Sequence, residues 1–268
     1  MIKVASSTWM IPGEDFTEKL ALAADMGFEG MEIRLLEEAA TAENLRQLSD
    51  GFSSGKLFPC SLLVPGDTFR RSLCDRAALD AKKDHAMRAL DIAAQLHAPT
   101  CLAPEYRYQD PLPLFDMKRP SPAEWELLLE FLSFASDYAG KVGAECLIEP
   151  LNRYETHFYY TMADGARAID EAGAVNVKIM ADLFHLGIEE VDVAAAIRSY
   201  GKYIGHVQIG DSNRQLPGQG HTDFMPAFRA LKEIGYDRCI ALECGILGDP
   251  VAELPKCARR MKDMLRDA

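Results

Sequence analysis

The sequence predicts an α/β protein that folds as one (β/α)8 TIM barrel over residues 1–268. Two observations predict it. Short apolar runs alternate along the chain with stretches in which apolar residues recur every three or four positions, the spacing of a helix face. There are eight such runs, and 268 residues divided among eight leave about 33 for each strand and its helix, the size of a barrel unit.

The eight apolar runs are short, and most are apolar throughout rather than alternating with polar residues. Strands of a parallel sheet that is covered on both faces have this pattern. We therefore predict strands, in chain order, at Lys3–Ser7, Gly30–Ile33, Leu57–Leu63, Thr100–Ala103, Ala144–Pro150, Val177–Asp182, Ile204–Ile209 and Arg238–Glu243.

The segments between these strands have apolar residues at helical spacing. They predict helices at Phe16–Met26, Asp75–Leu96, Ala123–Lys141, Met162–Ala172, Val193–Tyr200, Phe224–Ile234 and Val251–Leu265. Glycine, a common helix stop, follows several of them, at Gly27, Gly143, Gly173, Gly201 and Gly235.

An open, doubly wound sheet is the alternative architecture. Such a sheet usually has a glycine-rich phosphate-binding turn after its first strand, and residues 6–9 here read Ser-Ser-Thr-Trp. No segment rich in proline, glycine or serine divides the chain, so we expect a single domain.

Composition limits the partners and the compartment. The 29 basic and 41 acidic residues give a net charge of −12, which disfavours nucleic acid and anionic membranes as partners. No apolar run approaches the roughly 20 residues of a membrane span, and the first residues show no signal peptide. The seven cysteines are scattered and odd in number, so we expect reduced thiols and a cytoplasmic protein.

Four consecutive predicted strands carry an oxygen-bearing side chain at the carboxyl end, namely Glu149, Asp182, Gln208 and Glu243. One such residue alone is usually a solvated polar group or a helix cap. In a barrel, however, all four ends converge on the mouth where active sites lie. Three converging carboxylates repel each other unless a cation neutralises them. Oxygen ligands of this kind favour Mn²⁺ or Mg²⁺, so the four residues are candidate metal ligands.

Four further polar residues lie near these strand ends. His206 shares a strand face with Gln208 one layer deeper, so we expect it beside the metal ligands or in the core rather than on the metal. His185 is expected in the loop after its strand, within reach of a substrate hydroxyl. Glu155 follows in the loop after the fifth strand, and Arg214 precedes a Pro-Gly loop as a possible donor to a sugar oxygen or a phosphate.

The segments 148–156, 182–185 and 205–220, with Leu242 and Glu243, resemble the sugar phosphate isomerase/epimerase family of xylose-isomerase-like barrels, and most closely the D-tagatose/D-psicose 3-epimerases. The resemblance implies Mn²⁺, with Mg²⁺ or Co²⁺ as alternatives. It implies that Glu149 and Glu243 are both metal ligands and the catalytic acid/base pair. It also implies that Glu155, His185 and Arg214 hold the oxygens of a small-molecule sugar, and that the enzyme is a homodimer or homotetramer.

One position departs from the epimerase pattern. The epimerases have His-x-His on the seventh strand, whereas this chain has His206-Val207-Gln208, as hydroxypyruvate isomerase-like members do. The expected activity is therefore a metal-dependent ketose 3-epimerase or isomerase, which moves a proton through a cis-enediolate between two glutamates.

Alternatives to that activity differ in chemistry. A hydroxypyruvate isomerase-like aldose–ketose isomerase and an inosose dehydratase-like lyase use the same metal site. A metal-dependent abasic-site endonuclease is disfavoured by the negative charge and by the six histidines, few of which fall near the site. A non-catalytic sugar-binding barrel is disfavoured by the paired glutamates. Arginines are candidate phosphate contacts and aromatic residues are candidate pocket walls: Arg34, Arg70, Arg71, Arg107, Arg153, Trp9, Tyr106, Tyr108 and Phe158.

Overall fold

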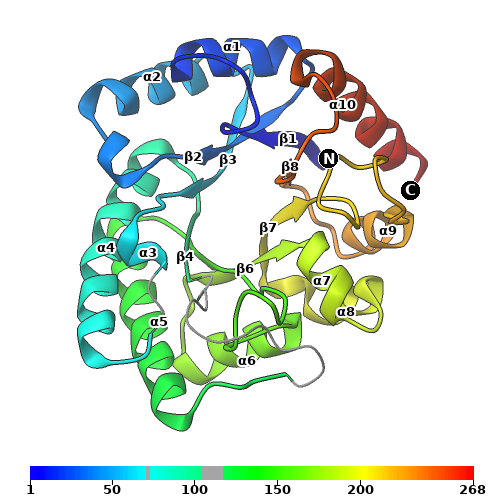
Figure 1. Cartoon of the computed structure of the whole chain (residues 1–268). Helices are drawn as coiled ribbons and strands as arrows, with labels where there is room; N and C mark the ends of the chain where they lie inside the picture. The colour runs from blue at the N-terminus through cyan, green and yellow to red at the C-terminus, as the bar shows by residue number, and fades with distance from the viewer. Residues whose placement is uncertain (71–72, 104, 106–116) are drawn as a thin grey trace.

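The computed structural model describes residues 1–70, 73–103, 105 and 117–268. In this part of the chain, eight parallel strands lie side by side in chain order, and β1 pairs with both β2 and β8, which closes the barrel. Figure 1 shows the strands at the centre and the helices around them. The predicted single-domain (β/α)8 barrel is confirmed.

The observed strands differ from the predicted ones by no more than two residues at either end. They are β1 (Lys3–Ser7), β2 (Gly30–Arg34), β3 (Phe58–Leu63), β4 (Thr100–Ala103), β5 (Cys146–Ile148), β6 (Val177–Asp182), β7 (Ile204–Ile209) and β8 (Cys239–Leu242). Because all of them run in the same direction, their carboxyl ends lie at one end of the barrel.

The helices include every predicted one and three others. The predicted ones are α1 (Phe16–Asp25), α4 (Arg76–Leu96), α5 (Pro122–Val142), α6 (Met162–Ala172), α8 (Val193–Tyr200), α9 (Met225–Glu233) and α10 (Pro250–Asp267). The others are α2 (Ala42–Ser53), α3 (Asp67–Arg70) and α7 (Leu183–Glu189), with short 3-10 turns η1 (Glu37–Ala39) and η2 (Gly201–Tyr203).

Helix α7 corrects the expectation that His185 lies in a loop. The side chain of Asp182 caps this helix, because its Oδ1 atom accepts a hydrogen bond from the backbone N–H of Phe184 at 2.9 Å. His185 therefore lies on the first turn of a helix, three residues after Asp182, and its orientation is fixed by that helix.

Two apolar layers support the barrel. The larger one lies between strands and helices and includes Met31, Ile33 and Leu62. A smaller cluster fills the barrel interior and consists of Leu63, Phe69, Cys101, Leu147 and Met180. Strand residues that face the interior beyond this cluster reach the mouth, where polar side chains gather.

Helix ends and cysteines agree with the sequence. Gly143 and Gly173 end α5 and α6 in the left-handed conformation, whereas Gly201 stays right-handed because the chain continues into η2. The seven cysteines form no disulfide, and all but Cys74 are buried. Across the described residues, every helix is too short or too polar to cross a membrane.

Candidate metal centre

The four predicted ligands lie at the carboxyl ends of adjacent strands. Glu149 follows β5 directly, Asp182 ends β6, Gln208 is one residue from the end of β7, and Glu243 follows β8. Asp182 and Gln208 are register partners across β6 and β7. Glu149, Asp182 and Gln208 are buried, and the Glu243 side chain is about one-fifth exposed.

Two of the candidate ligands have a buried oxygen atom that forms no hydrogen bond with a described residue, namely Oδ2 of Asp182 and Oε1 of Gln208. The same is true of Ser7 Oγ at the end of β1. The other oxygen of Asp182 caps α7, and the amide nitrogen of Gln208 is hydrogen-bonded within the barrel. Buried acceptors are nearly always hydrogen-bonded in folded proteins, so these two atoms are available to a ligand, although Asp182 Oδ2 also lies 3.7 Å from the Arg214 guanidinium.

The carboxylates hold their protons unusually tightly. Burial raises the pKa of Glu149 well above its usual value, and the nearby Glu243 and Asp182 raise it further. Burial raises the pKa of Asp182 to about 6, and burial with Asp182 and Glu32 nearby raises the pKa of Glu243 to about 8. Without a cation the site therefore retains protons, and a cation that binds there must displace them.

His185 lies in the middle of these carboxylates. Its Nε2 atom is 3.4 Å from Oδ2 of Asp182 and 3.8 Å from Oε1 of Glu149, and one atom from each of the three residues fits within a sphere suited to a metal ion. Its Nδ1 atom faces two donors of Asn152, the backbone N–H at 3.3 Å and Nδ2 at 2.7 Å. Burial, with help from Arg214, lowers the pKa of His185 to about 3. The ring is therefore neutral at pH 7. Donors face both of its nitrogens, because Nε2 also lies 3.1 Å from Nη1 of Arg214.

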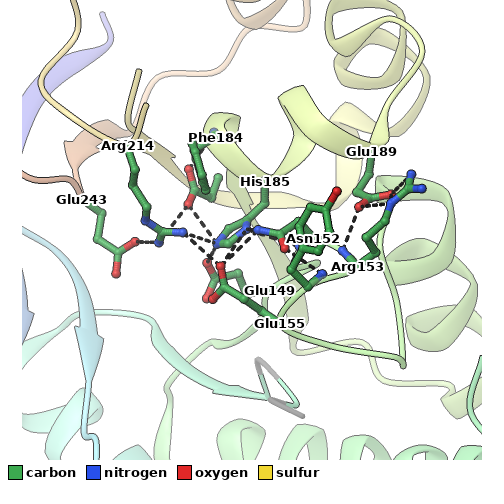
Figure 2. A network of polar contacts seen from close by, with 11 residues as sticks. Glu149, Asn152, Arg153, Glu155, Phe184, His185, Glu189, Arg214 and Glu243 are labelled. Carbon is green, nitrogen blue, oxygen red and sulfur yellow. Dashed lines mark hydrogen bonds and ion pairs between the residues drawn. The ribbon is translucent and has the colours of Figure 1, made fainter. Parts of the chain in front are cut away.

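Arg214 is the cation of the site in this state. Its Nη2 atom lies 2.8 Å from Oε2 of Glu243 and 3.7 Å from Oδ2 of Asp182, and its guanidinium lies 4.6 Å from the ring centre of Phe184. Figure 2 shows Arg214 between Glu243 on one side and Glu149, Glu155 and His185 on the other. Burial alone would lower the Arg214 pKa, but the surrounding carboxylates raise it, so it remains charged.

A buried aspartate shapes the loop that carries Arg214. Asp211 accepts hydrogen bonds from the backbone N–H groups of Ser212, Gly218 and Thr222. Burial would raise its pKa, but these N–H groups lower it to about 2. A Cβ atom at Gly220 would lie 2.3 Å from Oδ1 of Asp211, so only glycine fits there. Asp211 thus folds the loop back beside Arg214, whose φ of 55° is left-handed.

Glu155 lies at the edge of the site and is more than one-third exposed. Its Oε1 atom accepts a hydrogen bond from Asn152 Nδ2 at 3.1 Å and lies 3.4 Å from Arg214 Nη1. Arg153 in the same loop is bound by Glu189 of α7 through its guanidinium and its backbone N–H. These contacts fasten the loop after β5 onto the helix that carries His185.

His206 lies one layer below Gln208 and contacts a residue that the motif search missed. Its Nε2 atom is 3.1 Å from Oε2 of Glu32, and Gln208 Nε2 is 2.9 Å from that same oxygen. Glu32 is buried in the centre of β2. The one available signal was a glutamate inside the apolar run 30–33, because a charged residue in a buried strand needs a partner.

The donor set fits a divalent cation. Two buried oxygens that accept no hydrogen bond, on adjacent strands, and two carboxylates with raised pKa values supply oxygen ligands of the kind that Mn²⁺ and Mg²⁺ prefer, with the His185 nitrogen next to them. Glu243 also accepts a hydrogen bond from Arg214, so this guanidinium lies beside the candidate ligands.

The other residues singled out from the sequence are spread more widely. Phe158 is buried in the large core cluster, and Trp9 is nearly half exposed. Arg153 is paired with Glu189, and Arg34 ends β2. Arg71, Arg107, Tyr106 and Tyr108, with the side chain of Arg70, lie outside the described residues.

Comparisons with known proteins agree with the fold. The D-psicose 3-epimerase of Agrobacterium fabrum is 29% identical over 239 residues, which cover 88% of this chain and 80% of that protein. The 3-dehydro-D-guloside 4-epimerase of Escherichia coli is 26% identical over 255 residues, 94% of this chain and 95% of that one. A solved L-ribulose 3-epimerase superposes with a TM-score of 0.87 at 22% identity, covering 100% of this chain and 95% of that chain. Residues 20–266 match the family described as the xylose isomerase-like TIM barrel. This chain therefore belongs to the xylose isomerase-like TIM barrel family.

Proposed function

We propose that this protein is a divalent-metal-dependent ketose 3-epimerase. Glu149 and Glu243 are the acid/base pair, and Glu149, Asp182, Gln208 and Glu243 are the metal ligands. The observation that carries the proposal is a pair of buried oxygens that accept no hydrogen bond, Asp182 Oδ2 and Gln208 Oε1, between two glutamates whose pKa values are raised. The epimerases among its relatives support the reaction class.

The proton to be moved lies on the carbon beside a ketone and is too weakly acidic for a free carboxylate to remove. A bound divalent cation supplies stabilisation of the negative charge that develops on the ketone oxygen. Glu149 and Glu243 come from strands on either side of β6 and β7, so they approach a substrate held above those strands from opposite faces. One glutamate removes the proton, and the other delivers a proton to the opposite face, which inverts the carbon.

The raised pKa values suit this exchange. A carboxyl group whose pKa lies near neutral pH is a stronger base than a free carboxylate and also carries a proton in part of the population. Delivery of the proton at the neighbouring carbon would give aldose–ketose isomerisation by the same residues. Gln208, in the His-x-Gln pattern of strand β7, keeps that isomerisation as the second candidate.

Three residues are proposed to hold the sugar. His185 Nε2 lies beside Asp182 and Glu149 and 3.1 Å from the charged guanidinium of Arg214. Glu155 accepts at the edge of the site. Together they offer donors and an acceptor to neighbouring hydroxyl groups, while burial of His185 excludes water from one side.

The experiment is deuterium exchange. Chelator-treated enzyme reloaded with Mn²⁺ is incubated in D₂O with a panel of ketoses, and the products are examined by proton NMR. The proposal expects deuterium at C3 with appearance of the C3 epimer. Deuterium at C1 or C2 with an aldose product would identify the isomerase, and loss of water would identify a lyase. Absence of exchange with every ketose would contradict the proposal.

The native metal, the cellular compartment and the oligomeric state also belong to the proposed function. Mn²⁺ is the expected metal, with Mg²⁺ or Co²⁺ as alternatives, and the enzyme is proposed to be a cytoplasmic homodimer or homotetramer. Activity of apo-enzyme reloaded with each metal and light scattering after size-exclusion chromatography test the metal and the assembly.

A further inference from the structure

We propose that Glu32 is a positioning residue that orients Gln208 toward the metal centre. The inference rests on the metal site proposed above and adds a residue to it. Glu32 is not itself a ligand in this account. It holds the amide of Gln208 so that the side-chain oxygen, rather than the NH₂ group, faces the ion.

Three donors converge on a single oxygen of Glu32. Oε2 lies 2.9 Å from Ser61 Oγ, 2.9 Å from Gln208 Nε2 and 3.1 Å from His206 Nε2. All four side chains are buried, and they come from β2, β3 and β7 across the barrel interior. Water therefore cannot replace any of these partners.

This arrangement decides which end of the Gln208 amide faces which way. A carboxylate oxygen has no hydrogen to donate, so it can only accept hydrogen bonds from Ser61, His206 and Gln208. Gln208 must therefore present its NH₂ group to Glu32. Its Oε1 atom then points to the other side, where it has no partner among the described residues. On that side lies Asp182, the register partner of Gln208, whose Oδ2 likewise accepts no hydrogen bond from a described residue.

Without Glu32 the two ends of the amide are nearly equivalent in shape. The NH₂ group could then turn toward the cation, and its positive hydrogens would repel it. Groups that hold a metal ligand in this way typically contribute a factor of about 10–100 to metal affinity. Glu32 thereby allows the amide of Gln208 to act as a metal ligand. A histidine at this position would be oriented by the same carboxylate in the same way.

The test measures Mn²⁺ affinity by calorimetry on chelator-treated protein, without any turnover assay. We expect Glu32→Leu to weaken binding by about 10–100-fold, as Gln208→Leu does. Because Glu32 acts through Gln208, the double variant should bind no more weakly than Gln208→Leu alone. Ser61→Ala removes a different hydrogen bond to the same oxygen and serves as the matched control, with binding within about threefold of wild type.

Two results would overturn the inference. One is wild-type Mn²⁺ affinity in folded Glu32→Leu, and the other is a loss in the double variant equal to the product of the single losses. If Glu32→Leu does not fold, Glu32→Met, which also lacks an acceptor oxygen, is compared with Ser61→Ala, and equal affinities overturn the inference. If the wild-type protein does not bind Mn²⁺, the result contradicts the proposed metal site instead of the role of Glu32.

An independent observation concerns Arg34, the last residue of β2. It lies two residues after Glu32 and is the register partner of Leu63, which belongs to the cluster inside the barrel. Strand residues two apart share a face, so Arg34 faces the barrel axis at the mouth, above Glu32. Its backbone is fixed there, because its N–H donates to Thr8 Oγ1 at 2.9 Å.

Arg34 differs from the other partly buried arginines of the described residues. Arg153 is paired with Glu189, and Arg214 is paired with three carboxylates. The Arg34 guanidinium forms no hydrogen bond or ion pair with any described residue, although the site contains an excess of acids. Partial burial of a guanidinium without an anion is unfavourable, so a partner is expected to arrive from outside.

We infer that Arg34 binds an anionic group of the substrate, either a carboxylate or a phosphate. The inference rests on the proposed function and narrows its substrate to anionic ketoses. Both groups accept two parallel hydrogen bonds from a guanidinium, which is why the chemistry is shared. At the rim of the barrel, Arg34 can hold the end of the sugar that does not react.

The test uses the Mn²⁺-loaded enzyme with neutral ketoses, ketose phosphates and keto-sugar acids. We expect either the ketose phosphates or the keto-sugar acids to react with a lower KM than the neutral ketoses. The class with the lowest KM shows whether Arg34 binds a phosphate or a carboxylate. Arg34→Met should raise the KM of that substrate about 10–100-fold with little change in kcat, while the exposed Arg198→Met should change neither. Preference for neutral ketoses, or an unchanged KM in Arg34→Met, overturns the inference. Absence of turnover with every class contradicts the proposed function instead.

Discussion

The guanidinium of Arg214 lies 2.8 Å from the carboxylate of Glu243. The two residues lie 29 positions apart in the chain, and their contact joins the β7 loop to the end of β8. The same guanidinium lies 3.4 Å from Glu155. Arg214 therefore contacts the proposed acid/base residue, and its positive charge partly offsets the rise in pKa that burial causes at Glu243.

Arg214→Met should impair both binding and chemistry. Loss of a charge-assisted hydrogen bond to the substrate is expected to lower kcat/KM by about 10–100-fold. The pKa of Glu243 should also rise, because a neighbouring positive charge is lost. Steady-state kinetics with saturating Mn²⁺ measure the first effect, and Arg198→Met, at an exposed ion pair with Glu233, is the matched control. Equal values of kcat/KM in Arg214→Met and Arg198→Met would contradict the role of Arg214 in binding the substrate.

Glu149→Gln and Glu243→Gln should each abolish turnover while the barrel still folds. Loss of a general acid or base typically costs a factor of 10²–10⁴. The metal-free variants should melt at or above the wild-type temperature, because a neutral amide replaces a buried acid that its neighbours repel. Circular dichroism melts and activity assays check the two parts. A variant that retains near-wild-type rate would exclude that glutamate from proton transfer.

Metal binding should strengthen as the pH rises toward 8. In the metal-free fold the pKa of Asp182 is raised to about 6 and that of Glu243 to about 8, from ordinary values of 3.8 and 4.5. The folded protein thus holds more protons than the unfolded chain up to about pH 8, and these groups lower its stability as the pH rises. A bound cation displaces those protons and relieves the repulsion.

Thermal melts with and without Mn²⁺ at about pH 6.5 and about pH 8 measure this linkage. His185 still contributes at about pH 6.5, because its pKa is lowered to about 3 from 6.5, but the contribution is the same with and without Mn²⁺ and cancels in the comparison. We expect a larger Mn²⁺-induced rise in Tm at the higher pH and a reduced difference in Glu243→Gln. A rise in Tm that is independent of pH would contradict the assigned ligands.

Gly220→Ala should disorganise the loop that supports Arg214. The added Cβ atom would lie 2.3 Å from Oδ1 of Asp211, so the loop must move and hydrogen bonds to Asp211 are lost. We expect a stability loss of about 1–3 kcal/mol together with a raised KM. Gly187→Ala is the matched control, because a Cβ atom there meets nothing. Denaturant unfolding of both variants provides the measurement, and equal stabilities would refute this role for Asp211.

The sequence alone was sufficient to predict the barrel and the polar residues at the ends of its strands. A carboxylate or amide at the end of an apolar run, as at Glu149 or Gln208, is visible in one dimension, and the parallel topology brings such ends together. Helix α7 was missed because its start depends on Asp182, a proposed metal ligand, which also acts as the helix cap.

Contacts that depend on distant strands could not be predicted. Glu32 and Gln208 are 176 residues apart, and nothing in the run 30–33 indicates which strand its glutamate faces. The pairing of Arg214 with Glu243 likewise depends on the course of the Asp211 loop and on side-chain conformation. Register across the closed barrel, rather than local pattern, determines these pairs.

Titration of chelator-treated protein with Mn²⁺ tests the central claim most directly, because free Mn²⁺ can be counted by electron paramagnetic resonance. The account predicts one tight site per chain, full recovery of activity when that site fills, and loss of the site in Asp182→Asn. Turnover at the full rate by metal-stripped protein, or unchanged Mn²⁺ binding in Asp182→Asn, would contradict it.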